Sequence, residues 1–140
     1  MSTFRTATTI WKGPYHGGRA EVSFASSGLG SFGVGPAVSD VPPPGETSPM
    51  ELLAAAVASC ISGMLALLLE RVGHHAEQLE VSAEVELDGA SVAGVRAHIR
   101  GCVPGLPSDQ FGALAERAGK GCPVSKALAG TAISMTAELD

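Results

Sequence analysis

The chain has 140 residues, of which 45% are apolar and 16% are charged, and its formal net charge is −5. The apolar content excludes a disordered chain, and the 9 Lys and Arg residues are scattered singly, which argues against a nucleic-acid partner. The length predicts a single domain over residues 1–140, and the low charged fraction predicts that part of its surface is buried in an oligomer.

The first third of the chain predicts short β-strands. Strands are expected over residues 4–12 and 19–25, and the sequence Gly-Pro-Tyr-His-Gly-Gly between them predicts a hairpin or meander. A weaker strand is expected over residues 32–38. Residues 41–45, Val-Pro-Pro-Pro-Gly, predict an extended linker because proline fits neither a helix interior nor a central strand.

A long apolar helix is expected after this linker. Ser48 as N-cap, Pro49 at the first helical position and Glu51 three residues after the cap are typical of a helix start, and Gly73 is a plausible end. Residues 52–69 contain no charged side chain, and the length of this stretch is the lower limit for a membrane span. Their many alanines and the lack of a flanking basic cluster favour a buried central helix instead, so we expect no membrane association.

The second half of the chain predicts a sheet and two further helices. Alternating residues predict an antiparallel pair of strands over residues 80–87 and 94–103, and a last strand over residues 132–139. An amphipathic helix is expected over residues 107–120, and a short helix begins at Cys122. Strands and helices that do not alternate regularly indicate an α+β fold.

The three cysteines differ in their expected chemistry. No spacing fits a disulfide framework or a metal site, so we expect no cofactor, and reduced thiols predict a cytoplasmic protein. Cys60, in the middle of the apolar helix, is either a small core residue or a reactive thiol. Cys122 lies where free helical N–H groups stabilise a thiolate, whereas nothing nearby activates Cys102. The four histidines lack the spacing of a catalytic base, which favours redox chemistry over hydrolysis.

Two motifs resemble the OsmC/Ohr family. Residues 47–60, Thr-Ser-Pro-Met-Glu-Leu-Leu-Ala-Ala-Ala-Val-Ala-Ser-Cys, are similar to the family's first cysteine helix. Residues 121–128, Gly-Cys-Pro-Val-Ser-Lys-Ala-Leu, are similar to its second cysteine motif, and the resemblance extends over about residues 11–139. It implies an OsmC-like α+β fold, in which an intertwined homodimer packs long buried central helices against antiparallel sheets.

The resemblance also implies an activity. Members of the family are thiol-dependent peroxidases that reduce organic hydroperoxides, and hydrogen peroxide less well, in oxidative-stress defence. By match to the motifs, Cys60 would be the peroxidatic residue and Cys122 the resolving residue. An external dithiol, of the lipoyl type, would then reopen their disulfide.

Two positions depart from the family pattern. The family has a catalytic Glu where this chain has Met50, and Glu51 lies about 180° around the helix from Cys60, which favours a capping role for it. Glu46, in the preceding loop, is the candidate replacement. Arg19, after a Gly-Gly pair, is the candidate catalytic cation, although a solvated Arg in a turn is an alternative. The alternative function is a weak or inactive dimer that binds a ligand or has a structural role.

Overall fold

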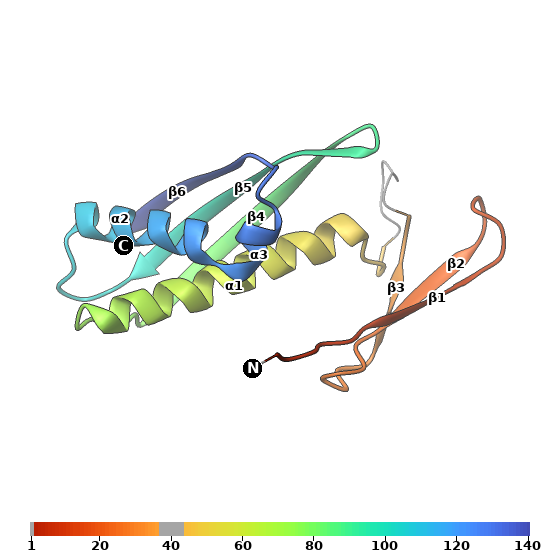
Figure 1. The fold of residues 1–140 in the computed structure, drawn as a ribbon, viewed down its shortest axis with the longest axis horizontal. Helices are drawn as coiled ribbons and strands as arrows, with labels where there is room; N and C mark the ends of the chain where they lie inside the picture. Colours follow the sequence, from red (N-terminus) through yellow and green to blue (C-terminus); the bar gives the residue numbers. More distant parts are fainter. Residues whose placement is uncertain (1, 37–43) are drawn as a thin grey trace. The chain divides into compact units, whose positions relative to one another are not determined.

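The computed structural model describes residues 2–36 and 44–140 and divides into two compact units, one ending at Leu52 and the other beginning at Leu53. The nine predicted elements are all present (Figure 1), with different ends for most of them. The elements are β1 (Thr8–Lys12), β2 (Arg19–Ser23), β3 (Ser31–Val34), α1 (Pro49–Arg71), β4 (Gln78–Asp88), β5 (Ser91–Cys102), α2 (Ser108–Gly121), α3 (Pro123–Ala127) and β6 (Ile133–Leu139). The end of the predicted third strand and most of the predicted linker lie outside the described residues.

The first unit is a three-stranded antiparallel sheet in the order β1-β2-β3. The predicted hairpin joins β1 to β2, with Lys12 opposite Arg19. Ala20, Val22 and Val34 are buried on one face, where Phe24 packs against them. The unit therefore has a small apolar core of its own.

The second unit contains a sheet in the order β4-β5-β6. β4 and β5 form the expected antiparallel hairpin, but β6 runs parallel to β5, which corrects the expectation of antiparallel sheets alone. The reason is the connection, because α2 and α3 lie between β5 and β6 in the chain. A crossover of this kind returns the chain so that the next strand runs in the same direction.

One face of this sheet forms the main core. Val95, Ala97 and Ile99 of β5 are buried, as their alternation predicted, while Arg96 and His98 between them are exposed. The same apolar cluster includes buried side chains from two helices (Val57, Ile61, Leu65, Leu68 and Leu69 of α1; Phe111, Leu114, Ala115 and Ala118 of α2). Both helices thus pack on the apolar face, and the polar face points away from them.

The ends of α1 follow the predicted signals. The Ser48 hydroxyl oxygen accepts a hydrogen bond of 3.1 Å from the Glu51 N–H, which confirms Ser48 as the cap. At the other end Gly73 has a φ of 83°, and the His74 N–H donates to the Leu69 carbonyl at 2.9 Å. A left-handed residue at this position ends the helix because it satisfies carbonyls that have no helical partner.

Gly101 of β5 provides a test of packing. A Cβ atom on this residue would lie 2.6 Å from Cζ of Phe111, whose ring is fully buried. We expect Gly101→Ala to lower the free energy of unfolding by about 1–3 kcal/mol, because the ring cannot move without disturbing the core. Urea denaturation followed by circular dichroism measures the change.

Gly112→Ala is the matched control. Gly112 lies in α2, and a Cβ atom there would meet no atom within 4 Å. The substitution should raise stability by about 0.5–1 kcal/mol through helix propensity. A stable Gly101→Ala variant would contradict the packing described for Phe111.

Candidate active site

The second unit brings two of the predicted site residues together. Cys60 lies in the middle of α1, and Cys122 occupies the corner where α2 ends and α3 begins. Cys122 belongs to the buried core cluster, and Cys60 packs against the same cluster. Cys60, Cys102 and Cys122 are all free thiols in this structure.

Cys122 is held by hydrogen bonds at the start of α3. Its sulfur accepts from the Ser125 N–H at 3.3 Å, and the Ser125 hydroxyl lies 3.1 Å from the same sulfur. Pro123, which has no N–H, occupies the first position of the helix, where a donor is not required. The predicted N-cap role of Cys122 is therefore confirmed.

The two thiols have shifted pKa values of opposite direction. Burial raises the pKa of Cys122, but hydrogen bonds from Ser125, Cys60 and the backbone of Val124 outweigh burial, and the pKa falls below its ordinary value. Burial raises the pKa of Cys60, and its interaction with Cys122 raises the pKa further against one backbone hydrogen bond from Val124. Of the two thiols, Cys122 therefore loses its proton more readily than Cys60.

Access to the two sulfurs also differs. Cys122 is 0% exposed, whereas Cys60 is only half-buried. A small reagent therefore reaches Cys60 more easily, although Cys122 is the better thiolate. The more exposed sulfur is thus that of Cys60, and the lower pKa is that of Cys122.

Cys102 is not part of this pair. It lies at the end of β5, where its thiol donates a hydrogen bond of 3.4 Å to a carboxylate oxygen of Glu77. This hydrogen bond and some burial raise the pKa of Cys102. A protonated thiol is a poor nucleophile, so the prediction that Cys102 is a bystander agrees with its surroundings.

In the first unit, the glycine pair before Arg19 is required by the hairpin turn. Gly17 has a φ of 90°, and a Cβ atom on Gly18 would lie 2.9 Å from the Lys12 carbonyl and 3.0 Å from Nε1 of Trp11. Only glycine therefore closes this turn without a clash. Arg19 then begins β2 with an exposed side chain.

Glu46 lies in the same unit as Arg19. Thr47 makes two backbone hydrogen bonds at the end of β3, since its N–H donates to Gly33 at 2.9 Å and its carbonyl accepts from Gly35, just after the strand, at 2.8 Å. A Cβ atom on Gly33 would lie 3.1 Å from Cγ of Glu46. Glu46 is thereby held over β3. Arg19 and Glu46 both line two cavities of about 420 and 370 Å³, so the first unit does bring these candidates to one region.

Glu51 does not complete the capping box expected for it. Its N–H donates to the Ser48 cap, but its carboxylate accepts a hydrogen bond of 2.6 Å from the Thr47 hydroxyl. The partner of the carboxylate is thus Thr47 rather than the Ser48 N–H of a standard capping box. Met50, in the position of the family's glutamate, is half-buried.

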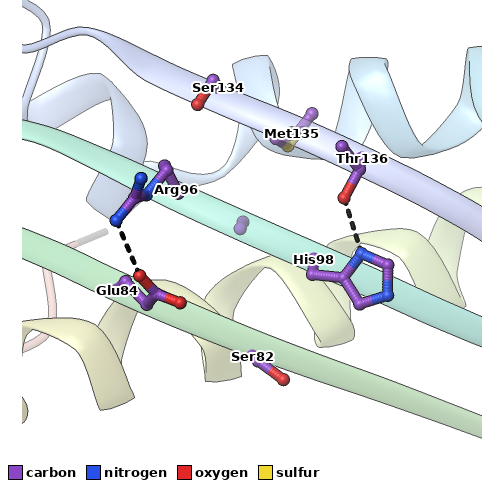
Figure 2. Close-up of a pocket in the computed structure, with 8 residues that line it drawn as sticks. Ser82, Glu84, Arg96, His98, Ser134, Met135 and Thr136 are labelled. Carbon is purple, nitrogen blue, oxygen red and sulfur yellow. Dashed lines mark hydrogen bonds and ion pairs between the residues drawn. The ribbon is translucent and has the colours of Figure 1, made fainter.

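A third hollow of about 420 Å³ lies on the polar face of the β4-β5-β6 sheet (Figure 2). Its polar side chains contact their neighbours: Arg96 pairs with Glu84 at 2.9 Å, and His98 lies 2.6 Å from the Thr136 hydroxyl and 2.8 Å from a carboxylate oxygen of Glu138. No cysteine lines it. Within residues 2–36 and 44–140, no cluster of His, Cys, Asp and Glu side chains could hold a metal ion.

Ser125 is the residue of this site that sequence reasoning missed. Ser125 lies three residues after the N-cap Cys122, and the N–H at this position normally donates to the cap. This spacing could have identified the N–H donor, but the hydroxyl contact depends on a side-chain rotamer.

Comparison with known proteins identifies the family. Residues 42–138 match the family described as OsmC-like protein. The chain belongs to this family. The Peroxiredoxin OsmC of Escherichia coli (strain K12) is 34% identical over 86 residues, which cover 59% of this chain and 60% of the relative. The match therefore spans less than two thirds of that curated protein.

Solved OsmC-like structures have the same fold. An OsmC-like protein of unknown function from Vibrio cholerae aligns with a TM-score of 0.78 and 15% identity, covering 98% of this chain and 100% of that chain. The organic hydroperoxide resistance protein OhrB of Bacillus subtilis aligns with a TM-score of 0.64 and 22% identity, covering 96% and 98%. The helix α1, which is long and apolar enough to span a membrane, is thus part of a known α+β fold.

The contact between Cys102 and Glu77 gives a prediction about thiol reactivity. Because the hydrogen bond to Glu77 favours the protonated thiol, Glu77→Gln should lower the pKa of Cys102 and speed its alkylation at neutral pH severalfold. Iodoacetamide labelling followed by peptide mass spectrometry measures the rate. Glu80→Gln, on the neighbouring strand, is the control and should leave the rate nearly unchanged; equal rates in wild type and Glu77→Gln would contradict the prediction.

Proposed function

We propose that this protein is a thiol-dependent peroxidase that reduces organic hydroperoxides, and hydrogen peroxide less well, in oxidative-stress defence. The observation that carries the proposal is the pair of free thiols, Cys60 and Cys122, in which the more accessible sulfur is paired with a buried thiol of lowered pKa. The relative named as a peroxiredoxin supports the same chemistry. The small number and wide spacing of the cysteines also favour a cytoplasmic location.

The proposed cycle has three steps. The Cys60 thiolate attacks the distal oxygen of the hydroperoxide, so the O–O bond breaks, an S–O bond forms, and the alcohol leaves after it gains a proton. The Cys122 thiolate then attacks the sulfur of the sulfenic acid and expels hydroxide, which becomes water. An external dithiol, with a lipoyl-type group as our proposed reductant, reduces the disulfide.

Arg19 and Glu46 are the proposed polar helpers of this cycle. The guanidinium of Arg19 would stabilise the thiolate and the charge that develops on the peroxide oxygen. Glu46 lines the same cavities as Arg19, which supports a carboxylate role for it in place of the missing family residue. The alternative, a weak or inactive dimer that binds a ligand, is favoured by one observation, the presence of Met50 at the family's glutamate position.

The direct test is peroxide consumption with cumene hydroperoxide and dihydrolipoamide. Wild type should turn over, and Cys60→Ser should not. With stoichiometric peroxide, peptide mapping should recover a Cys60–Cys122 disulfide while Cys102 stays free, because the pKa of Cys102 is raised. Turnover that survives Cys60→Ser would refute the proposal, and a major disulfide with Cys102 would show that the resolving role was misassigned.

We also propose that the protein is a homodimer with active sites that need both chains. Only one side of α1 is buried, and Leu67 on that helix remains 41% exposed although residues 52–69 carry no charge. Such an uncharged surface favours association. Light scattering should give twice the chain mass of 14.1 kDa, and a stable folded monomer would exclude this assembly.

The position of Met50 predicts a gain of function. A carboxylate there should orient the arginine, an interaction worth roughly 1.5–3 kcal/mol, so Met50→Glu should speed Cys60 oxidation roughly ten- to a hundredfold. Stopped-flow measurement of the second-order rate tests this. Glu51→Gln is the matched control and should mainly weaken the start of α1.

Glu46→Gln decides between the two carboxylate positions. If Met50→Glu is no faster and Glu46→Gln abolishes the reaction, Glu46 has the carboxylate role. If Glu51→Gln abolishes the reaction instead, the capping assignment of Glu51 is wrong.

A further inference from the structure

Ser125 is a buried polar residue whose role the proposed cycle does not explain. Its side chain is 7% exposed and its hydroxyl lies 3.1 Å from the sulfur of Cys122. Its N–H donates to the same sulfur at 3.3 Å. One residue therefore presents two polar groups to a thiol that is itself fully buried.

The direction of the hydroxyl contact depends on the charge of Cys122. A thiolate has no proton and can only accept, so the Ser125 hydroxyl must donate to it. A hydrogen bond to a charged acceptor is stronger than one between neutral groups. Ser125 thus stabilises the thiolate of Cys122 more than its thiol.

Hydrogen bonds stabilise the thiolate of Cys122. Among the described residues, the titratable group that acts on Cys122 is Cys60 of α1, and it does so by hydrogen bonding. Lys120 of α2 and Lys126 of α3, the charged residues nearest in sequence, are exposed to solvent. Among the contacts that oppose the effect of burial on the pKa of Cys122, the hydrogen bond of the Ser125 side chain has the largest effect.

We propose that Ser125 is a positioning residue that favours the thiolate of Cys122, so that Cys122 can attack oxidised Cys60. The inference rests on the proposed function and deepens it by assigning a residue to the resolving step. In that step the Cys122 thiolate forms the S–S bond with Cys60 while the S–O bond of the sulfenic acid breaks, and the hydroxide that leaves takes a proton from solvent and becomes water.

A test without peroxide isolates the attack of Cys122 on Cys60. In a Cys102→Ser background, Cys60 reacts with dithiobis(nitrobenzoate) to form a mixed disulfide and release one nitrothiophenolate. The Cys122 thiolate then attacks the Cys60 sulfur, forms the Cys60–Cys122 disulfide and releases a second nitrothiophenolate. The rate of the second release reports the thiolate of Cys122.

Ser125→Ala removes the hydroxyl and retains the N–H. We expect the second release to slow about tenfold at neutral pH, and its pH profile to move to higher pH, because one hydrogen bond to a charged group is lost. Ser125→Thr retains the hydroxyl and should behave as wild type. An unchanged rate and pH profile in Ser125→Ala would overturn the proposal, and so would a Thr variant that is slower than the Ala variant, since packing would then be the cause.

Two further results keep the inference separate from the proposed function. If Ser125→Ala does not fold by circular dichroism, Ser125→Gly replaces it with the same criteria, because it also lacks the hydroxyl and adds no atom. If wild type consumes no peroxide but the second release depends on Ser125, the proposed function fails while the role of Ser125 stands. If wild type consumes peroxide and the release does not depend on Ser125, only the inference fails.

Discussion

The burial of an uncharged helix is the constraint on which the second unit depends. Residues 52–69 offer no charged side chain to water, so α1 must be covered by apolar surface. The apolar face of the β4-β5-β6 sheet and the helix α2 supply this cover. Because Cys60 is part of α1, packing of the helix also fixes the position of the reactive thiol.

The thiol pair shows how a core can contain chemistry without a charged cluster. Cys122 is surrounded by apolar side chains, which by itself would favour the neutral thiol. Hydrogen-bond donors from Ser125 and Cys60 reverse that preference. The thiol that loses its proton more readily is thus the buried one, and the thiol that solvent reaches is its partner Cys60.

Local sequence signals predicted most of the fold and part of the site. Ser48 and Cys122 were identified as helix caps because capping depends on neighbours within one turn of helix. The inward side chains of β5 followed from alternation. The direction of β6 did not follow, since strand pairing across a crossover depends on contacts distant in sequence.

The polar details of the site were the hardest to predict. The partner of the Glu51 carboxylate and the hydroxyl contact of Ser125 each depend on one rotamer. The position of Glu46 over β3 depends on the backbone hydrogen bonds of Thr47, which no residue pattern indicates. Sequence therefore identified which residue types are available, and tertiary structure decided which of them meet.

The parallel pairing of β6 also determines the order in which the chain can fold. β4 and β5 join through a tight turn between Asp88 and Ser91, so their hairpin closes a short loop. The contact between His98 of β5 and Thr136 of β6 joins residues that are 38 positions apart. Closing so long a loop costs more conformational entropy than closing the β4-β5 hairpin. Cys122 lies in the segment between these two strands, so it meets Cys60 of α1 only through contacts between residues that are distant in sequence.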